Sequence, residues 1–401
     1  MTNEEQGFLN ILCSALDGGT FDGDFTAEEW NSIFGLANIQ LLLPIVFEAV
    51  CGSRAAGENP ELFKAVKGQV IKNVVWQLNR NVDFRELYSK LCKAGLHPIV
   101  IKGQLCSTLY PLPDHRISSD DDLLVSPAEY DKCRKIFESE GILPEKDDDG
   151  DSYETSYVSD KLRIELHRSL FDDSGSSPDD FNRFFADAFD TAVKSGDYWS
   201  LSAHEHLLYL LLHSFKHFTI AGVGIRQTCD IGFWMRAHFG EIDWERLRTE
   251  LASVHAERFA AAQFGLLEKY LGFEFGLPVD WREMVDSTEL EPMLADMFEG
   301  GSYGSSSLSR LHSSTAVLSA IRASRSGKGR SGILRSIFPK YSYIAGKYPY
   351  VKRCPLLLPI GWLDRLVHYA AELKTTDSSA SGSLRIARER VELLKFYDVI
   401  D

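Results

Sequence analysis

The stretch that decides the fold runs from residue 98 to 125 and reads Pro-Ile-Val-Ile-Lys-Gly-Gln-Leu-Cys-Ser-Thr-Leu-Tyr-Pro-Leu-Pro-Asp-His-Arg-Ile-Ser-Ser-Asp-Asp-Asp-Leu-Leu-Val. It predicts a buried strand that ends at Lys102-Gly103, a short helix, a turn, and a second strand that begins with Asp120, Asp121 and Asp122. Carboxylates two residues apart at the start of a strand project to the same side and repel each other. Mg²⁺ relieves such repulsion and completes its shell with phosphate oxygens and water. The stretch therefore indicates phosphate chemistry.

The composition is that of an ordinary globular protein, with 44% apolar and 25% charged residues in 401. A formal net charge of −15 argues against general nucleic-acid binding, which favours a basic domain. The seven cysteines are scattered without a CxxC pair, which is typical of reduced thiols in a cytoplasmic protein. The longest apolar runs are too short to span a bilayer, and the acidic N-terminus is not a signal peptide. We therefore expect a cytoplasmic protein with no membrane span.

The periodicity of apolar residues predicts an α+β fold in four regions. Residues 1–95 form a helical N-terminal region that includes a long helix over about 60–91. Residues 96–200 form the α+β domain, with strands expected over 97–101, 122–125, 152–158 and 162–170. Residues 201–300 return to helices, and residues 301–401 form a basic, proline-punctuated and helical C-terminal region.

A third carboxylate is expected from the segment Lys-Leu-Arg-Ile-Glu-Leu-His at 161–167. Its period-2 alternation puts the apolar residues on one strand face and Arg163, Glu165 and His167 on the other. If this strand lies near the Asp120 strand, then Asp120, Asp122 and Glu165 can together hold two metal ions. The phosphates would then be lined by cations, a hydroxyl and a glycine that lets backbone N–H groups approach, namely Lys102, Gly103, Arg116 and Ser118.

These residues resemble the bacterial nucleotidyltransferase-like family of the polymerase-beta superfold. The resemblance rests on the following positions: Lys102-Gly103, Tyr110, Arg116, Ser118, Asp120, Asp122-Leu123-Leu124-Val125 and Ile164-Glu165-Leu166-His167. The resemblance continues through a helical segment with Leu207 to His213, Lys216-His217 and Arg226 to Asp230, and through a C-terminal segment from Phe338-Pro339 to Arg365. It thus covers most of the chain after residue 95.

The resemblance implies a polymerase-beta-like catalytic domain with a mixed sheet, flanked by helical N-terminal and C-terminal regions. It also implies transfer of a nucleoside monophosphate from an NTP, with ATP as the expected donor, to an unidentified acceptor hydroxyl with release of pyrophosphate. The metal ligands would be Asp120, Asp122 and Glu165, binding Mg²⁺ or Mn²⁺. Two residues depart from the family pattern: Gln104 stands where serine is usual, and Asp121 stands where an apolar residue is common.

Other interpretations remain open at this point. The chain can be a non-catalytic nucleotide-binding or regulatory module on the same fold, or a metal-dependent phosphohydrolase. Lys216 and His217 are candidate substrate contacts, whereas the spacing of His206, His213 and His217 along one helix would also suit a zinc site. Arg226 and Asp230 stand four apart and can be only a helix ion pair.

A basic stretch near the C-terminus contrasts with the acidic chain. No Asp or Glu occurs between Gly300 and Leu363, but ten cations do: Arg310, Arg322, Arg325, Lys328, Arg330, Arg335, Lys340, Lys347, Lys352 and Arg353. This asymmetry predicts a local positive surface. It either folds back on the acidic surface of the protein or docks an anionic acceptor.

Overall fold

A computed structural model describes residues 1–146, 152–172, 180–220, 222–302, 317, 321, 341, 344, 348–365 and 380–400. Most of the basic stretch, from Arg310 to Lys347, lies outside these residues. Lys352 and Arg353 are described and exposed at the end of a short helix. The predicted positive surface therefore stays a prediction.

Five helices precede the sheet: α1 (Asn3–Leu16), α2 (Ala27–Ile39), α3 (Leu43–Val50), α4 (Arg54–Glu58) and α5 (Pro60–Lys93). Reciprocal hydrogen bonds between Thr and Glu three residues apart open α1 at Thr2 and α2 at Thr26. The helix predicted over 60–91 is confirmed as α5, which has 34 residues and a proline at its start. It ends just before Gly95, which has a φ of 75°.

The α+β expectation is confirmed by a seven-stranded mixed sheet in the order β3-β4-β5-β2-β1-β7-β6. Its strands are β1 (Ile99–Val100), β2 (Asp121–Leu124), β3 (Leu143–Pro144), β4 (Glu154–Val158), β5 (Arg163–His167), β6 (Val193–Ser195) and β7 (Tyr198–Ser200). The four predicted strands are present, but three of them are shorter than expected at their ends. β3, β6 and β7 were not predicted, because two or three residues carry no readable alternation.

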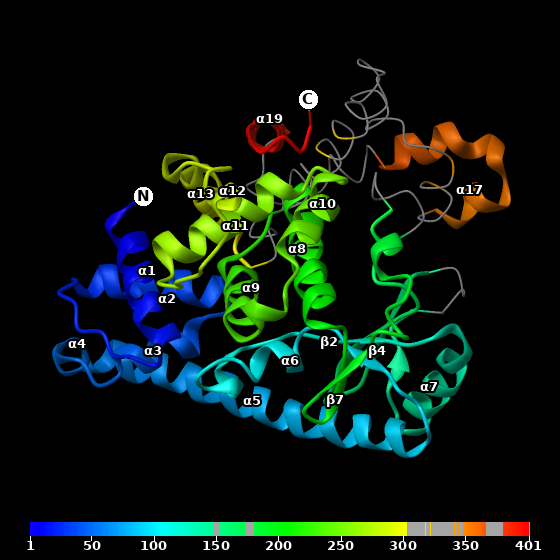
Figure 1. Cartoon of the computed structure of the whole chain (residues 1–401), viewed down its shortest axis with the longest axis horizontal. Helices are drawn as coiled ribbons and strands as arrows, with labels where there is room; N and C mark the ends of the chain where they lie inside the picture. The colour runs from blue at the N-terminus through cyan, green and yellow to red at the C-terminus, as the bar shows by residue number, and fades with distance from the viewer. Residues whose placement is uncertain are drawn as a thin grey trace.

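Short helices connect the strands, and α5 and α8 enclose the sheet from opposite sides. The connecting elements are α6 (Gln104–Ser107), η1 (Pro113–His115), α7 (Pro127–Ser139) and η2 (Asn182–Phe185). Figure 1 shows α5 running along the bottom of the view below the strands, with α8 (Ala203–Ile220) and α9 (Ile225–His238) above them. The face of the sheet that lies toward α8 and α9 is therefore the face that can form a cleft.

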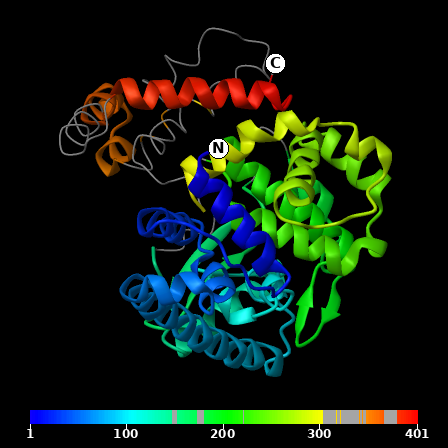
Figure 2. The ribbon, with the colours of Figure 1, turned by 90° about the vertical axis from the view of Figure 1, so that its left-hand side faces the viewer.

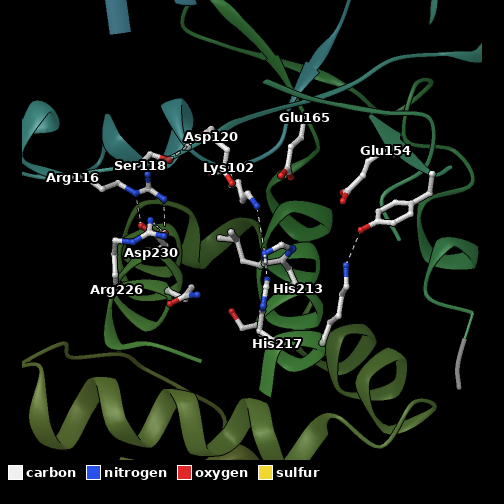
Figure 3. A pocket seen from close by; sticks show the side chains of 16 residues that line it. Lys102, Arg116, Ser118, Asp120, Glu154, Glu165, His213, His217, Arg226 and Asp230 are labelled. Carbon is white, nitrogen blue, oxygen red and sulfur yellow. Dashed lines mark hydrogen bonds and ion pairs between the residues drawn. The ribbon is translucent and has the colours of Figure 1, made fainter. Parts of the chain in front are cut away.

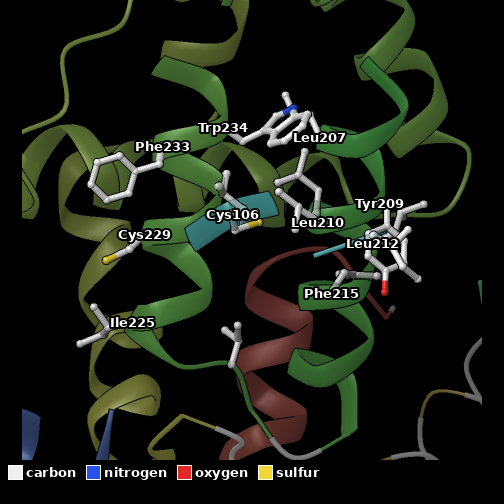
Figure 4. Packing of buried hydrophobic residues seen from close by; sticks show 14 of the residues in the cluster. Cys106, Leu207, Tyr209, Leu210, Leu212, Phe215, Ile225, Cys229, Phe233 and Trp234 are labelled. Carbon is white, nitrogen blue, oxygen red and sulfur yellow. The ribbon is translucent and has the colours of Figure 1, made fainter. Parts of the chain in front are cut away.

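A helical layer follows the sheet. After α8 and α9 it contains η3 (Phe239–Glu241), α10 (Trp244–Ala252), α11 (Glu257–Tyr270), α12 (Val279–Arg282), η4 (Ser287–Leu290) and α13 (Glu291–Gly300). Ser202 and Glu205 exchange the two hydrogen bonds of a capping box at the start of α8. Apolar side chains of α8 and α9 pack together with Cys106 of α6 (Figure 4), which joins this layer to the sheet.

The described C-terminal elements are α17 (Pro349–Arg353), η5 (Pro355–Leu357) and α19 (Ala380–Phe396). Figure 2 shows α19 lying across the helical layer. Arg390 of α19 holds Asp296 of α13 through a buried ion pair of 2.6 Å. In the described part of the chain, no helix combines the length and the apolar character needed to cross a membrane.

Candidate active-site cleft

The centre of the candidate site is the parallel pair β2 and β5. Their register places Asp122 beside Glu165 and Leu124 beside His167. Because strand side chains alternate, Glu165 and His167 share the face of Asp122. His167 Nε2 lies 3.2 Å from Asp122 Oδ1 and 3.9 Å from Glu165 Oε2. The ligand atoms of these three residues all lie within 4.8 Å of one another.

The predicted triad of Asp120, Asp122 and Glu165 is only partly assembled in this way. Asp120 lines the same cleft as Glu165, but it is outside the compact group of three, in which His167 takes the third place. Asp120 precedes β2, which begins at Asp121. The strand pairing therefore does not fix the position of the Asp120 side chain. His167 stands two residues after Glu165 and therefore lies on the same face of the strand. This spacing is the sequence feature that places His167 beside the carboxylates.

Lys102 and Gly103 follow β1 and bring a cation to the carboxylates. Lys102 Nζ lies 3.1 Å from Asp122 Oδ1 and 3.4 Å from His213 Nε2. Gly103 has a φ of +42°, and a Cβ there would lie 3.3 Å from Asp121 Oδ1. Both the backbone conformation and the space therefore favour glycine. The turn directs Lys102 at the carboxylates.

The cleft above this group has a volume of about 220 Å³. Figure 3 shows its strand wall with Lys102, Asp120 and Glu165, facing α8 with His213 and His217. Eight of the nine predicted site residues line it: Lys102, Gly103, Arg116, Ser118, Asp120, Glu165, Lys216 and His217. The ninth, Asp122, is buried and contacts Lys102.

Arg116 lines the cleft, but part of its guanidinium is already engaged within the protein. Its Nε and Nη2 each donate to Asp230 of α9 at 2.7 Å. Tyr110 donates to the same carboxylate at 2.8 Å, and Arg226 Nη1 lies 3.6 Å from it. Arg226 and Asp230 are therefore more than an isolated helix pair, because Asp230 joins the loop before β2 to α9.

The histidines of α8 do not form the zinc site that their spacing allowed. His213 Nε2 and His217 Nε2 lie 3.1 Å apart, which joins the two rings. His206 instead stacks on Trp234 with ring centroids 3.9 Å apart. Among the described residues, the group of three that could hold a metal ion is the one around Asp122, and the pair of histidines has no third ligand there. Lys216, one residue before His217, donates to Tyr153 Oη at 3.1 Å.

Burial and neighbouring charges shift the pKa values of several residues in the site. Burial and the neighbouring Asp122 raise the pKa of Glu165 to about 7. Burial would also raise the pKa of Asp122, but Lys102 and His167 outweigh it and lower this pKa below its usual range. Burial lowers the pKa of Lys216, and burial with Lys102 lowers the pKa of His217 to about 3. The negative charge of the cleft carboxylates therefore exceeds the single positive charge of Lys102.

These residues fit a divalent cation. Asp122 Oδ2 is buried and, within the described residues, has no hydrogen-bond partner. An unpartnered buried carboxylate oxygen is costly unless a cation or water meets it. Carboxylate oxygens are the ligands that Mg²⁺ and Mn²⁺ prefer, whereas an imidazole is a softer donor that better suits other transition metals. The two carboxylates therefore fit the expected metal, with His167 beside them.

Gln104 and Asp121, the two residues that depart from the family pattern, contact each other. Gln104 Nε2 donates to Asp121 Oδ1 at 3.0 Å, and Arg80 Nη2 lies 2.5 Å from Asp121 Oδ2. Arg80 also donates to the carbonyl of Ser118, and Gln77 accepts from the Ser118 amide at 2.8 Å. Asp121 therefore faces α5, away from the cleft, and its role is to anchor the strand.

Several cleft residues were not predicted as site residues. Glu154 lies beside His167 in the β4–β5 register, and its Oε2 is 3.6 Å from His167 Nδ1. Tyr153, His213 and Gln227 also line the cleft. Glu154 falls in a predicted strand, but only the register of that strand against β5 identifies its neighbour. Such a register cannot be read from one sequence.

Comparison with known proteins agrees with this geometry. The chain matches the family described as "Uncharacterised nucleotidyltransferase" over residues 26–272. The match begins well before residue 95, so it includes α5, and it ends before the expected C-terminal segment at 338–365. No curated protein and no solved structure matches the chain. Because the match spans more than half of the chain, the protein belongs to the uncharacterised nucleotidyltransferase family.

Proposed function

We propose that the protein is a metal-dependent nucleotidyltransferase of the polymerase-beta superfold. It would transfer a nucleoside monophosphate from an NTP, with ATP as the expected donor, to an acceptor hydroxyl and release pyrophosphate. The observation that carries this proposal is the alignment of Asp122 with Glu165 on neighbouring parallel strands, at the floor of a cleft lined with cations. Membership of the family supports the reaction class.

The carboxylates of Asp122 and Glu165 would hold the metal, with His167 and Asp120 beside them. Bound Mg²⁺ or Mn²⁺ supplies charge neutralisation for the transferring phosphoryl group and the leaving pyrophosphate. His167 would orient Asp122, because its Nε2 lies 3.2 Å from Asp122 Oδ1. Glu154 would in turn orient His167 from its other ring nitrogen.

The remaining cleft residues would bind and orient the substrates. Lys102 neutralises phosphate charge, and Gly103 and Ser118 allow the phosphates to approach the backbone. In the reaction, the acceptor oxygen forms a bond to the α-phosphorus while the bond to the bridging oxygen of the β-phosphate breaks. The hydroxyl proton passes to a carboxylate of the cleft, either one of the aspartates or Glu165. Lys216 and His217 on the α8 wall would contact substrate.

The experiment that tests this function follows the label of the donor. The protein is incubated with Mg²⁺ and an NTP labelled at the α-phosphate or, in parallel, at the γ-phosphate, with fractionated cell extract as the acceptor pool. We expect the α-label in an acceptor and the γ-label in pyrophosphate, both abolished by EDTA. The matched variant Asp122→Asn should abolish transfer, whereas Asp131→Asn, an exposed change on α7, should not.

Two other outcomes would contradict the proposal. Release of the γ-label as free phosphate, with no labelled acceptor, would identify a phosphohydrolase. Binding of the NTP without release of either label across the extract fractions would identify a nucleotide-binding module. Transfer by Asp122→Asn at the wild-type rate would overturn the metal assignment itself.

A further inference from the structure

Two guanidinium groups meet one carboxylate at one end of the cleft. Arg116 makes two hydrogen bonds of 2.7 Å to Asp230, and Arg226 Nη1 lies 3.6 Å from the same carboxylate. Tyr110 Oη donates to Asp230 Oδ1 at 2.8 Å. All four side chains are buried. Since Tyr110 is neutral, the cluster holds two positive charges against one negative charge and is left with a net charge of about +1 at pH 7.

Both guanidinium groups keep unused donors. Arg116 Nη1 and Arg226 Nε are buried, and in the described part of the chain neither has a hydrogen-bond partner. Both side chains line the cleft. A buried donor that lacks a partner costs free energy, so its persistence at a cleft wall is explained when a ligand supplies the acceptor.

The surroundings of these donors also favour an anion. Arg226 and Gln227 lie in the first turn of α9, which begins at Ile225, and both line the cleft. The N-terminus of a helix of this length carries partial positive charge.

The position of the cluster relative to the carboxylates fits a chain of phosphates. Figure 3 shows Arg116, Arg226 and Asp230 grouped on one side of the cleft and Glu165 and Glu154 on the other, with Lys102 between them. A triphosphate whose α-phosphate lies at Glu165 would extend past Lys102 toward the two arginines. The cations of the cleft therefore follow the direction in which such a ligand carries its charge.

We propose that Arg116 and Arg226, both held and oriented by Asp230, form the subsite for the terminal phosphate of the nucleoside triphosphate. This inference rests on the proposed function and adds which residues bind the terminal phosphate of the donor. Guanidinium groups suit this task because their planar donors bind phosphate oxygens in pairs. Asp230 keeps both groups in place before the ligand arrives, so the ligand does not have to order them.

The test compares Arg226→Gln with the wild-type protein by titration calorimetry in the presence of Mg²⁺. The probes are ATP, AMP and inorganic tripolyphosphate. The Kd of ATP and of tripolyphosphate should rise by about 10- to 100-fold, the usual loss for a hydrogen bond to a charged group. The Kd of AMP should not change, because AMP lacks the terminal phosphate. Arg226→Lys keeps the charge but loses the planar donors. Its Kd for ATP should therefore lie between those of the wild type and Arg226→Gln.

The matched control is Arg236→Gln on the same helix. Arg236 is exposed and pairs with Asp17 at 2.9 Å, away from the cleft, so this variant should bind all three probes like the wild type. Arg226→Gln leaves both hydrogen bonds between Arg116 and Asp230 in place, and a melting curve close to that of the wild type would confirm that it folds.

The outcomes separate this inference from the proposed function. If Arg226→Gln binds ATP as tightly as the wild type, the subsite is wrong, even when the wild type transfers nucleotide. An equal rise in the Kd of AMP would also overturn the subsite assignment, because Arg226 would then contact another part of the nucleotide. If the wild-type protein binds ATP but transfers no α-label to any acceptor, the proposed function fails whatever Arg226 does.

Discussion

Asp121 and Asp122 are neighbours in the chain but belong to different parts of the molecule. Asp122 lies toward Lys102 and His167, at the floor of the cleft. Asp121 lies on the opposite face of β2, where Arg80 and Gln104 hold it. This separation follows from the alternation of side chains along a strand. One carboxylate is therefore available to a metal, while the other is already neutralised.

The stability of two variants should show this division. Asp121→Asn leaves Arg80 buried beside a neutral amide, and loss of one partner of a buried ion pair costs about 3–5 kcal/mol of unfolding free energy. Asp122→Asn should also cost stability without metal, because it removes the partner of Lys102, but the cost should be smaller. The Lys102 side chain is 17% exposed, whereas that of Arg80 is 1% exposed, and Lys102 keeps Asp120 and Glu165 as neighbours. Urea denaturation of both variants measures the difference.

A larger loss of stability in Asp122→Asn than in Asp121→Asn would contradict these assignments. The measurement is made in EDTA, so that metal binding does not stabilise the wild type and enlarge the apparent cost of Asp122→Asn.

At the scale of single elements, α5 holds the loop that precedes β2. Gln77 accepts a hydrogen bond from the Ser118 amide at 2.8 Å, and Asn81 donates to Asp114 at 2.7 Å. Arg80 donates to the Ser118 carbonyl. These polar side chains occupy the buried face of the helix, where apolar residues are the rule. The helix therefore serves as a support for the active-site loop as well as a cover for the sheet.

The histidines of α8 should make the protein sensitive to acid. Burial, together with the nearby His238, lowers the pKa of His206 from 6.5 to about 3. Between these two values the unfolded chain binds a proton that the folded chain excludes, so stability falls as the pH drops from about 6.5 toward 3. Above that window the loss is absent. His213 and His217 of the same helix shift in the same direction.

The prediction concerns His206→Gln. Near pH 5 this variant should show a smaller dependence of unfolding free energy on pH, by up to about 1.4 kcal/mol per pH unit for the one proton removed. Urea denaturation at pH 8, 6 and 5 measures this slope. The control is His97→Gln, which removes an exposed histidine in the same way. An unchanged slope in His206→Gln would show that His206 does not titrate on unfolding.

At the scale of the whole molecule, much of the site was predictable because strand alternation and spacing are local. Alternation alone placed Glu165 and His167 on one face, and the turn chemistry predicted Lys102 and Gly103 beside the carboxylates. The pairing of Arg116 with Asp230 was not predictable, because 114 positions separate the two residues and the fold brings them together. The same holds for Gln104 and Asp121, which looked like two unrelated departures but hydrogen-bond to each other.

The division into regions and the roles of the site residues stay predictions. The helices before residue 95 carry a larger part of the site than their sequence indicated, because Gln77, Arg80 and Asn81 are polar residues whose partners lie in the loop after β1. The anionic acceptor and its docking by residues 310–353 also stay predictions, since most of that stretch lies outside the described residues.

The central claim is that the neighbouring carboxylates of β2 and β5 bind a divalent cation. The most direct measurement is Mn²⁺ binding, monitored by electron paramagnetic resonance. The wild-type protein and the control Asp131→Asn should bind Mn²⁺ alike, and Mg²⁺ should compete with it. Asp122→Asn and Glu165→Gln should each weaken binding by at least about 10-fold, because each removes a ligand. Equal Mn²⁺ affinity in all four proteins would contradict the account.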